Sequence, residues 1–419
     1  MKCVLLILSA LISLSTCRIF QNRSTTFHPV VIIPGDGGTQ MEANLTGKPS
    51  VVHPFCRRYT SDYFDLWLNM QEFLPIAIDC FAHNIMLDIN PETGEVTDMP
   101  GVDVRIPGFG HTSSVEFLDK SRIAQTSYFF GMIESLVKMG YRRGMDVTAA
   151  PYDFRRAPEQ LGDYYDRLKA LIERTYQRAG NEKVVIVGHS LGNLVALRFF
   201  TEIVDQEWKD TYIKSHVAVA PPWGGSVKIV LLYTSGYNFE NSEYILPSMG
   251  LRTAQRTFTS SAYLFPNRLA YRDDEVLATV GTKNYTLADM KTFFDEINYS
   301  IGWRQVEKLD SLNRKLPAPG VKVYCVYGVG EPTTSRIHWP TASSFPDRVA
   351  TDISDGEGDG TVDVKSASLC KQWNPENNAG KDVTLHHVLK ADHMYMLHHP
   401  TVLDVIHRAV SGRSKADET

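Results

Sequence analysis

Residues 184–192 read Val-Val-Ile-Val-Gly-His-Ser-Leu-Gly, and a helix-like apolar stretch follows over residues 193–200. Four consecutive β-branched residues are typical of a strand whose two faces are both buried. The pattern Gly-x-Ser-x-Gly after such a strand is typical of a sharp turn that presents the serine at its tip and leads into a helix. Since the bare pattern also arises by chance, its strand and helix context carries the prediction that Ser190 is a nucleophile.

Further apolar runs along the chain alternate with longer amphipathic stretches. This alternation predicts a parallel sheet covered by helices, as in the α/β-hydrolase fold. The clearest helix is predicted over residues 159–178, where apolar residues recur at three- and four-residue spacing. The predicted strands are residues 30–33, 184–187, 216–220 and 321–327.

Two stretches interrupt this alternation and predict insertions into the α/β core. One lies between Cys56 and Cys80, and the other, over about residues 225–317, is polar and rich in aromatic residues, which suggests an inserted cap or lid. The predicted organisation is a signal peptide at 1–17, α/β-hydrolase core at 18–47, 83–224 and 318–419, an inserted subdomain at 48–82, and a cap or lid at 225–317.

The first residues are typical of a secretory signal peptide, with Lys2 before an apolar run over residues 4–14 and small residues up to Cys17. That run is too short to cross a bilayer, so we expect a soluble, lumenal mature chain. The net charge of −5 gives no basic surplus that would favour nucleic acid as a partner. Four Asn-x-Ser/Thr sequons fit the secretory route and are candidate glycosylation sites: Asn22, Asn44, Asn284 and Asn298.

Four cysteines remain once the signal peptide is removed: Cys56, Cys80, Cys325 and Cys370. An even number of cysteines in an oxidising compartment indicates disulfides, and four residues allow three pairings. We favour Cys56 with Cys80, and Cys325 with Cys370.

A serine hydroxyl is a weak nucleophile until a base removes its proton, so a histidine and an orienting carboxylate are needed. In this fold they follow the serine in the order Asp, His. Asp359 lies in a glycine-rich loop, and His393 lies shortly before a final helix-like stretch. Spacing alone cannot choose His393 over four nearby histidines, which are His386, His387, His398 and His399.

Residues 355–360, Asp-Gly-Glu-Gly-Asp-Gly, resemble the opening of an EF-hand calcium loop. Ser366 stands where that loop needs a bidentate glutamate, so we reject calcium binding. We expect no metal and no other cofactor.

Acyl transfer develops negative charge on a carbonyl oxygen, and two backbone N–H groups normally receive it. The N–H of Leu191, directly after the nucleophile, is the first candidate. The second is expected from the glycine-rich residues 34–38, where we favour the N–H of Asp36, although a simple turn is the alternative interpretation.

Tyr63, Trp67, Met70 and Leu74 recur at helical spacing inside the first insertion. The spacing predicts an amphipathic helix, and such a helix can lie on a lipid surface. Together with Leu68, these residues are the candidate membrane contacts. The alternative is that the stripe packs against the rest of the domain.

Several segments resemble one family across nearly the whole mature chain, that of lysosomal phospholipase A2 (group XV) and lecithin–cholesterol acyltransferase. The resemblance rests on residues 52–56 (Val-His-Pro-Phe-Cys), 66–69 (Leu-Trp-Leu-Asn), 73–75 (Phe-Leu-Pro), 104–110 (Val-Arg-Ile-Pro-Gly-Phe-Gly), 150–155 (Ala-Pro-Tyr-Asp-Phe-Arg) and 222–225 (Pro-Trp-Gly-Gly). It implies that Ser190, Asp359 and His393 form the triad, that Asp36 and Leu191 are the oxyanion positions, and that Cys56 pairs with Cys80 in a membrane-binding subdomain.

The resemblance also implies calcium-independent removal of fatty acyl chains from glycerophospholipids through an acyl-serine. The expected partners are a phospholipid membrane or lipoprotein surface and a lipid alcohol acceptor such as ceramide, in the lysosome or outside the cell. Asp36, Asn193 and Gly360 look like the lysosomal branch, whereas residues 188–191, Gly-His-Ser-Leu, are closer to the plasma branch. A secreted lecithin–cholesterol acyltransferase and a non-catalytic lipid-binding protein are the alternatives.

An acid compartment would leave an ordinary histidine base largely protonated. We hypothesise that Asp36 compensates for this loss of base strength. Its carboxylate would repel the developing oxyanion when ionised and would stop repelling it when protonated, which favours activity in acid.

Overall fold

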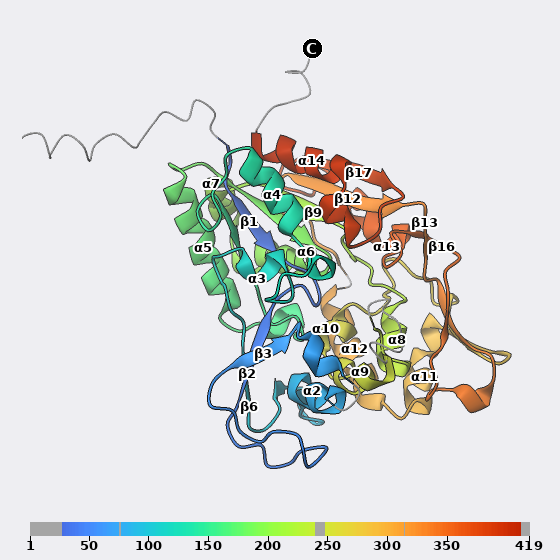
Figure 1. The fold of residues 1–419 in the computed structure, drawn as a ribbon. Coiled ribbons are helices and arrows are strands. Elements are labelled where there is room, and N and C mark those ends of the chain that lie inside the picture. The colour runs from blue at the N-terminus through green and yellow to red at the C-terminus, as the bar shows by residue number, and fades with distance from the viewer. Residues whose placement is uncertain (1–26, 75–76, 239–247, 314, 412–419) are drawn as a thin grey trace, which may run out of the picture.

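A computed structural model describes residues 27–74, 77–238, 248–313 and 315–411 (Figure 1). The predicted signal peptide at 1–17, the sequon at Asn22 and part of the predicted cap lie outside the described residues. Within the described ranges, no helix is both long and apolar enough to cross a membrane.

A six-stranded sheet forms the centre of the α/β core, in the order β17-β12-β9-β8-β1-β7, and every neighbouring pair is parallel. Figure 1 labels four of its strands, β1, β9, β12 and β17. The four predicted strands are confirmed as β1, β8, β9 and β12. The two edge strands were not predicted, because β7 has only three residues and β17 interrupts its apolar residues with Thr384, His386 and His387. The strands are β1 (Val30–Ile33), β7 (Val147–Ala149), β8 (Val184–His189), β9 (Ile213–Val219), β12 (Val323–Val329) and β17 (Val383–Leu389).

Helices cover both faces of this sheet, so its apolar strands are buried on two sides. Val31 and Ile33 of β1 face a core shared with α5 (Tyr164–Arg178) and α6 (Leu191–Arg198). Val30 and Ile32 face a second core shared with α4 (Phe130–Lys138) and α14 (Pro400–Ser411). This is the α/β-hydrolase fold that the alternation of strands and helices predicted.

The helix predicted over residues 159–178 begins later than expected. Pro158–Gln160 form a short 3-10 helix, and Gly162 then takes a positive φ of 56°, which a continuing α-helix does not accept. The α-helix α5 therefore starts at Tyr164.

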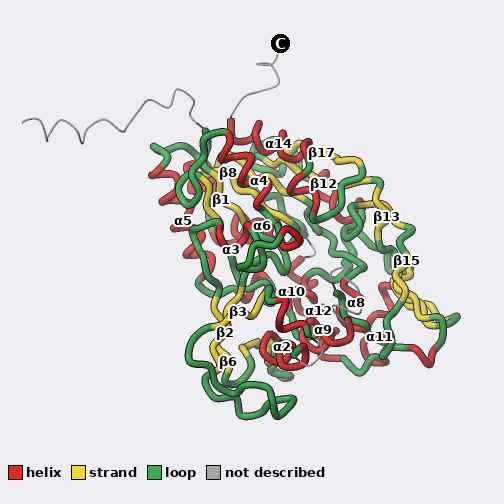
Figure 2. Tube along the Cα trace, in the orientation of Figure 1, coloured by secondary structure: helices red, strands yellow, loops and turns green. Residues whose placement is uncertain are grey.

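Most of the predicted cap lies at the carboxyl end of the sheet and is largely helical (Figure 2). Its β10 (Val276–Val280) and β11 (Lys283–Thr286) form a four-stranded sheet with two strands from beyond the predicted boundary at 317, β14 (Arg336–Trp339) and β15 (Thr351–Ile353). Its helices are α8 (Ile229–Thr234), α9 (Ser248–Gln255), α10 (Thr259–Tyr263), α11 (Met290–Glu296) and α12 (Ser300–Asn313).

The first insertion contributes β3 to a three-stranded sheet, β3-β2-β6, whose other two strands lie outside the predicted bounds of 48–82. A helix, α2 (Ile78–Ile85), begins in the insertion, ends beyond residue 82 and packs against α9. The predicted helix through Tyr63 and Leu74 is wrong. Residues Phe64–Trp67 form β3, which pairs with β2 (Met41–Leu45), and only Met70–Phe73 make a short 3-10 turn. Pairing with a distant strand outweighs local periodicity here.

Both favoured disulfides are present, Cys56–Cys80 and Cys325–Cys370. Among the described sequons, Asn284 and Asn298 are exposed, whereas Asn44 is partly buried in β2 and its Oδ1 accepts a hydrogen bond from Thr60. Glycosylation itself stays a prediction.

The remaining short elements connect these units. They are β4 (Leu87–Ile89), β5 (Val96–Asp98), β6 (Val102–Arg105), α3 (Ser113–Glu116), α7 (Gln206–Tyr212), β13 (Glu331–Thr333), β16 (Gly356–Gly358) and α13 (Val364–Ala367).

Candidate active site

Ser190 lies between β8 and α6 with φ 50° and ψ −128°, a strained conformation for a residue with a side chain. The flanking glycines make room for it. A Cβ on Gly192 would lie 2.3 Å from the carbonyl oxygen of Ile33, and one on Gly188 would lie 2.4 Å from Asn193 Oδ1. This elbow, residues 188–192, therefore has the geometry that its sequence predicts.

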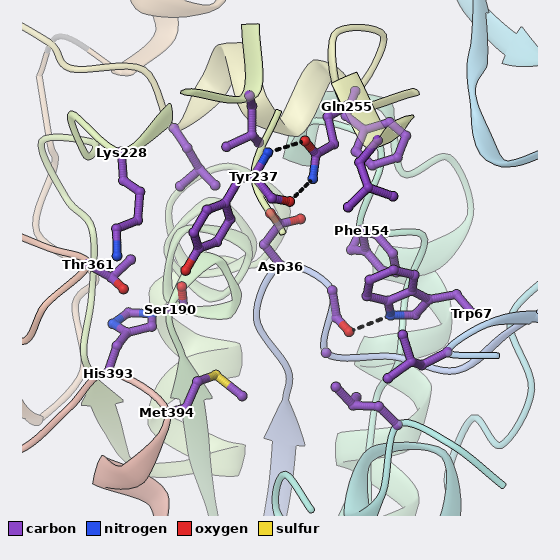
Figure 3. A pocket seen from close by; sticks show the side chains of 18 of the residues that line it. Asp36, Trp67, Phe154, Ser190, Lys228, Tyr237, Gln255, Thr361, His393 and Met394 are labelled. Carbon is purple, nitrogen blue, oxygen red and sulfur yellow. Dashed lines mark hydrogen bonds between the residues drawn. The ribbon is translucent and has the colours of Figure 1, made fainter. Parts of the chain in front are cut away.

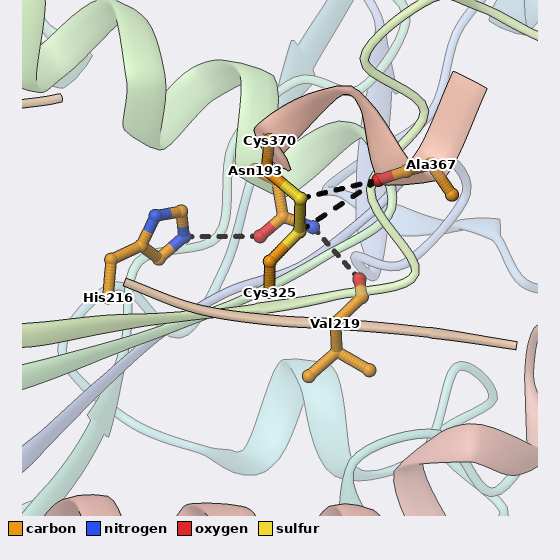
Figure 4. The surroundings of a disulfide bond; sticks show 6 residues. All are labelled: Asn193, His216, Val219, Cys325, Ala367 and Cys370. Carbon is orange, nitrogen blue, oxygen red and sulfur yellow. Dashed lines mark hydrogen bonds between the residues drawn. A yellow bond between two sulfur atoms is a disulfide. The ribbon is translucent and has the colours of Figure 1, made fainter. Parts of the chain in front are cut away.

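Asn193, directly after the elbow, makes hydrogen bonds through both ends of its side-chain amide, and Figure 4 shows those to Val219 and His216. Its Nδ2 donates to the carbonyl oxygens of Val219, at 2.9 Å, and Ser190, at 3.1 Å, and its Oδ1 accepts from Nε2 of His216 at 3.1 Å. Burial lowers the pKa of His216 to about 3, so this imidazole stays neutral. The carbonyl oxygens of Ser190 and Val219 thus have hydrogen-bond donors at a buried position.

Asp359 and His393 come together as predicted. His393 Nδ1 lies 2.8 Å from Asp359 Oδ2, and the N–H of His393 donates to the carbonyl oxygen of Asp359 at 2.9 Å. The other carboxylate oxygen, Oδ1, accepts from the backbone N–H groups of Thr361, at 3.0 Å, and Val362, at 2.7 Å. A carboxylate fixed in this way holds the imidazole in one orientation.

Ser190 and His393 line the same pocket (Figure 3). The only other histidine among the described lining residues is His189. The four competitors are placed elsewhere: His386 and His387 lie on β17, His398 packs against Gly131, and His399 Nδ1 accepts from the N–H of Thr401. The structure therefore agrees with the choice of His393, although its catalytic role stays a proposal.

Asp36 lines the pocket on the turn after β1 (Figure 3). The residue as a whole is only partly buried because one side faces the pocket, but its Oδ1 is buried and has no hydrogen-bond partner among the described residues. Burial raises the pKa of Asp36 to about 7, against a smaller lowering by the N–H of Gly37. A carboxyl at the expected oxyanion position thus changes charge near neutral pH.

The pocket has a volume of about 510 Å³, and most of its lining is apolar. The first insertion contributes Trp67 and Phe73, and the cap contributes Ile229 and Leu232. Such a lining suits an acyl chain better than a polar substrate. The sequence did not single out the cap residues, because apolar residues in a helix are more often core than pocket.

Two polar contacts shape the pocket wall (Figure 3). The indole N–H of Trp67 donates to the carbonyl oxygen of Gly37 at 2.8 Å. The side chain of Gln255 accepts from the N–H of Tyr237 at 2.8 Å and donates to its carbonyl oxygen at 2.7 Å. These bonds tie the first insertion to the turn after β1 and join two segments of the cap.

The candidate membrane contacts occupy different environments. Trp67 is buried in the pocket wall, Leu68 and Met70 line the pocket, and Leu74 is 61% exposed. Tyr63 lies against the guanidinium of Arg105, 3.7 Å from the ring centre, and its hydroxyl donates to Asp103. The residues therefore do not form one face of a helix, and their membrane role stays a proposal.

A family model described as lecithin:cholesterol acyltransferase matches residues 63–400. The chain is 42% identical over 385 residues to the lysosomal phospholipase A and acyltransferase of Homo sapiens, covering 92% of this chain and 90% of that protein. It is 39% identical over 369 residues to the phosphatidylcholine-sterol acyltransferase of Gallus gallus, covering 88% and 87%.

A crystal structure of the Tle4–Tli4 complex superposes with a TM-score of 0.50 at 14% identity, covering 93% of this chain and 98% of that one, and shows a shared fold. The family predicted from the segments above is confirmed by the matches in sequence. The chain is an enzyme that belongs to the lecithin:cholesterol acyltransferase family.

Proposed function

We propose that the protein removes fatty acyl chains from glycerophospholipids and passes them to water or to a lipid alcohol such as ceramide. The observation that carries this proposal is an apolar pocket of about 510 Å³ with Ser190 and His393 in its wall. An acyl chain can lie in this pocket with its ester carbonyl at the serine.

In the first half-reaction, Ser190 Oγ attacks the ester carbonyl while His393 Nε2 takes the serine proton. Asp359 stabilises the imidazolium by accepting a hydrogen bond from its Nδ1–H, with Nδ1 and Asp359 Oδ2 2.8 Å apart. The N–H groups of Asp36 and Leu191 receive the negative charge of the tetrahedral intermediate. When the ester C–O bond breaks, His393 returns its proton to the departing lysophospholipid, and the acyl chain stays on Ser190.

The second half-reaction runs in the opposite direction with a new nucleophile. Water or an alcohol gives its proton to His393 and attacks the acyl-serine carbonyl, and the release of Ser190 yields a fatty acid or a new ester. Every step moves only protons and acyl groups, so we propose that neither calcium nor any other cofactor takes part.

We place the enzyme at a phospholipid membrane or lipoprotein surface. Met70, which lines the pocket, is 38% exposed, and Leu74, which follows the lining residue Phe73, is 61% exposed. Exposed apolar side chains next to a pocket favour contact with lipid. The lysosome is the favoured compartment, because the raised pKa of Asp36 suits an acid site. The alternative, a secreted enzyme that acylates a sterol, is favoured by the Gly-His-Ser-Leu sequence of the elbow.

Fatty acid release and acyl transfer from phosphatidylcholine liposomes test this proposal. Liposomes that contain ceramide or cholesterol are compared at pH 4.5 and 7.4, with the Ser190→Ala variant as the control and with a chelator present. We expect Ser190-dependent release and ceramide acylation at pH 4.5. Acylation of cholesterol at pH 7.4 would support the sterol acyltransferase. The absence of activity in both the wild type and Ser190→Ala would support a lipid-binding role.

A further inference from the structure

A chain of buried hydrogen bonds joins three of the segments that carry candidate catalytic groups, namely the turn after β1, the elbow and the loop of His393. The N–H of Gly35, on the turn after β1, donates to the hydroxyl of Tyr128 at 2.9 Å. That hydroxyl lies 2.7 Å from Nδ1 of His189, in the elbow. Nε2 of His189 lies 3.0 Å from the backbone oxygen of His393.

The direction of each bond follows from its partners. A backbone carbonyl only accepts, so Nε2 of His189 carries a proton and donates it to His393. Burial lowers the pKa of His189 to about 3 and raises that of Tyr128, so both groups stay neutral. Nδ1 of a neutral imidazole with a protonated Nε2 is an acceptor, and the Tyr128 hydroxyl therefore donates to it while accepting from Gly35.

The same two side chains also fill the space between these segments. Tyr128 and His189 are each 1% exposed. A Cβ on Gly38 would lie 2.5 Å from the Tyr128 ring, and the rings of His189 and His393 lie 4.9 Å apart. None of the three segments can therefore move far without displacing Tyr128 or His189.

We propose that Tyr128 and His189 are positioning residues that hold the oxyanion turn, the elbow and the loop of His393 in register for acyl transfer. The inference rests on the proposed function, because it assigns a role in that reaction. Tyr128 sets the turn that carries the Asp36 N–H, and His189 sets the backbone of the catalytic base. Small displacements of such groups weaken transition-state contacts far more than substrate binding.

Tyr128→Phe tests the proposal, since it removes one hydroxyl and keeps the ring. We expect kcat on a soluble p-nitrophenyl ester to fall by about tenfold to a hundredfold while KM changes by less than about twofold. The matched control is Tyr165→Phe, whose buried hydroxyl donates to the carbonyl oxygen of Pro158 at 2.9 Å, away from the pocket lining. An equal loss of kcat in both variants, or none in Tyr128→Phe, would overturn the proposal.

A second pair of variants separates positioning from folding. His189→Gln keeps a side-chain N–H donor, whereas His189→Leu removes it, so Gln is expected to retain several-fold more kcat than Leu at equal thermal midpoints. Equal kcat values for His189→Gln and His189→Leu would contradict a positioning role for this hydrogen-bond network of Tyr128 and His189.

The rate at which an alkyl fluorophosphonate labels Ser190 reports the same geometry without any phospholipid. If the wild type labelled quickly but released no fatty acid from liposomes, the proposed function would fail and the network would still be judged by the labelling rates.

Discussion

Replacement of Asp36 by Asn should remove a pH dependence that burial imposes on both stability and rate. The pKa of Asp36 is raised from 3.8 to about 7 in the folded protein. A carboxyl whose folded pKa is raised stabilises the fold at low pH, and this contribution is lost as the pH rises through the folded pKa. An asparagine of nearly the same shape does not titrate.

The magnitude follows from that shift. Between pH 4.5 and 7.5 the unfolded chain is mostly ionised at this position while folded Asp36 stays protonated up to about pH 7. At about 1.4 kcal/mol per pKa unit, Asp36 should cost the wild type about 3 kcal/mol of unfolding free energy over this interval, and Asp36→Asn should not show that loss. Urea unfolding at the two pH values measures the difference, and Asp166→Asn, at an exposed position on α5, is the control.

The rate should follow the protonated fraction if the ionised carboxylate repels the oxyanion. From pH 7 to pH 8.5 this fraction falls by about fifteenfold for a pKa near 7. The rate on a soluble ester should fall accordingly in the wild type and stay nearly level in Asp36→Asn. An unchanged fall in rate at alkaline pH in Asp36→Asn would show that Asp36 does not repel the oxyanion, whatever the stability result.

Further predictions concern the elbow, the second disulfide and the lipid-facing surface. Gly192→Ala should destabilise the fold by about 3 kcal/mol in urea unfolding, because its Cβ would lie 2.3 Å from a backbone oxygen of β1; a wild-type midpoint would contradict this. Replacing Cys325 and Cys370 together by Ala opens a loop with a sequence separation of 45 and should cost roughly 4 kcal/mol in the chain-entropy model, measured in the same way. Leu74→Glu, at a position 61% exposed and outside the pocket lining, should weaken sedimentation with phosphatidylcholine liposomes and leave soluble-ester hydrolysis within about twofold; unchanged sedimentation would show that lipid is bound elsewhere.

The central fold could be predicted because each inner strand is a run of β-branched residues that only a two-sided core accommodates. The elbow was predictable for the same reason, since residues 184–192 contain the strand and the turn together. The choice of His393 needed the family resemblance, because six histidines lie between residues 386 and 407 and sequence distance says nothing about which one lies near Ser190.

Contacts between distant segments were beyond sequence reasoning. The spacing of Tyr63 and Trp67 fits a helix equally well, but pairing with β2 makes the segment a strand. The sequence gives no reason to single out Tyr128, which lies in an apolar stretch. Its hydroxyl contacts His189, 61 residues away in the chain, and only the folded structure shows this contact. His189 lies inside the elbow, but the pattern Gly-x-Ser-x-Gly accepts any residue at that position. The pattern therefore predicted no role for its imidazole.

In the proposed reaction, Ser190 accepts an acyl chain directly from a phospholipid. The most direct measurement is a rapid acid quench of the wild type with phosphatidylcholine liposomes, followed by mass spectrometry of the peptide that contains Ser190. We predict that this peptide gains the mass of one fatty acyl group during turnover, and that Ser190→Ala releases fatty acid about 10⁶-fold more slowly with no acylated peptide. Fatty acid release by Ser190→Ala at the wild-type rate would show that Ser190 is not the nucleophile.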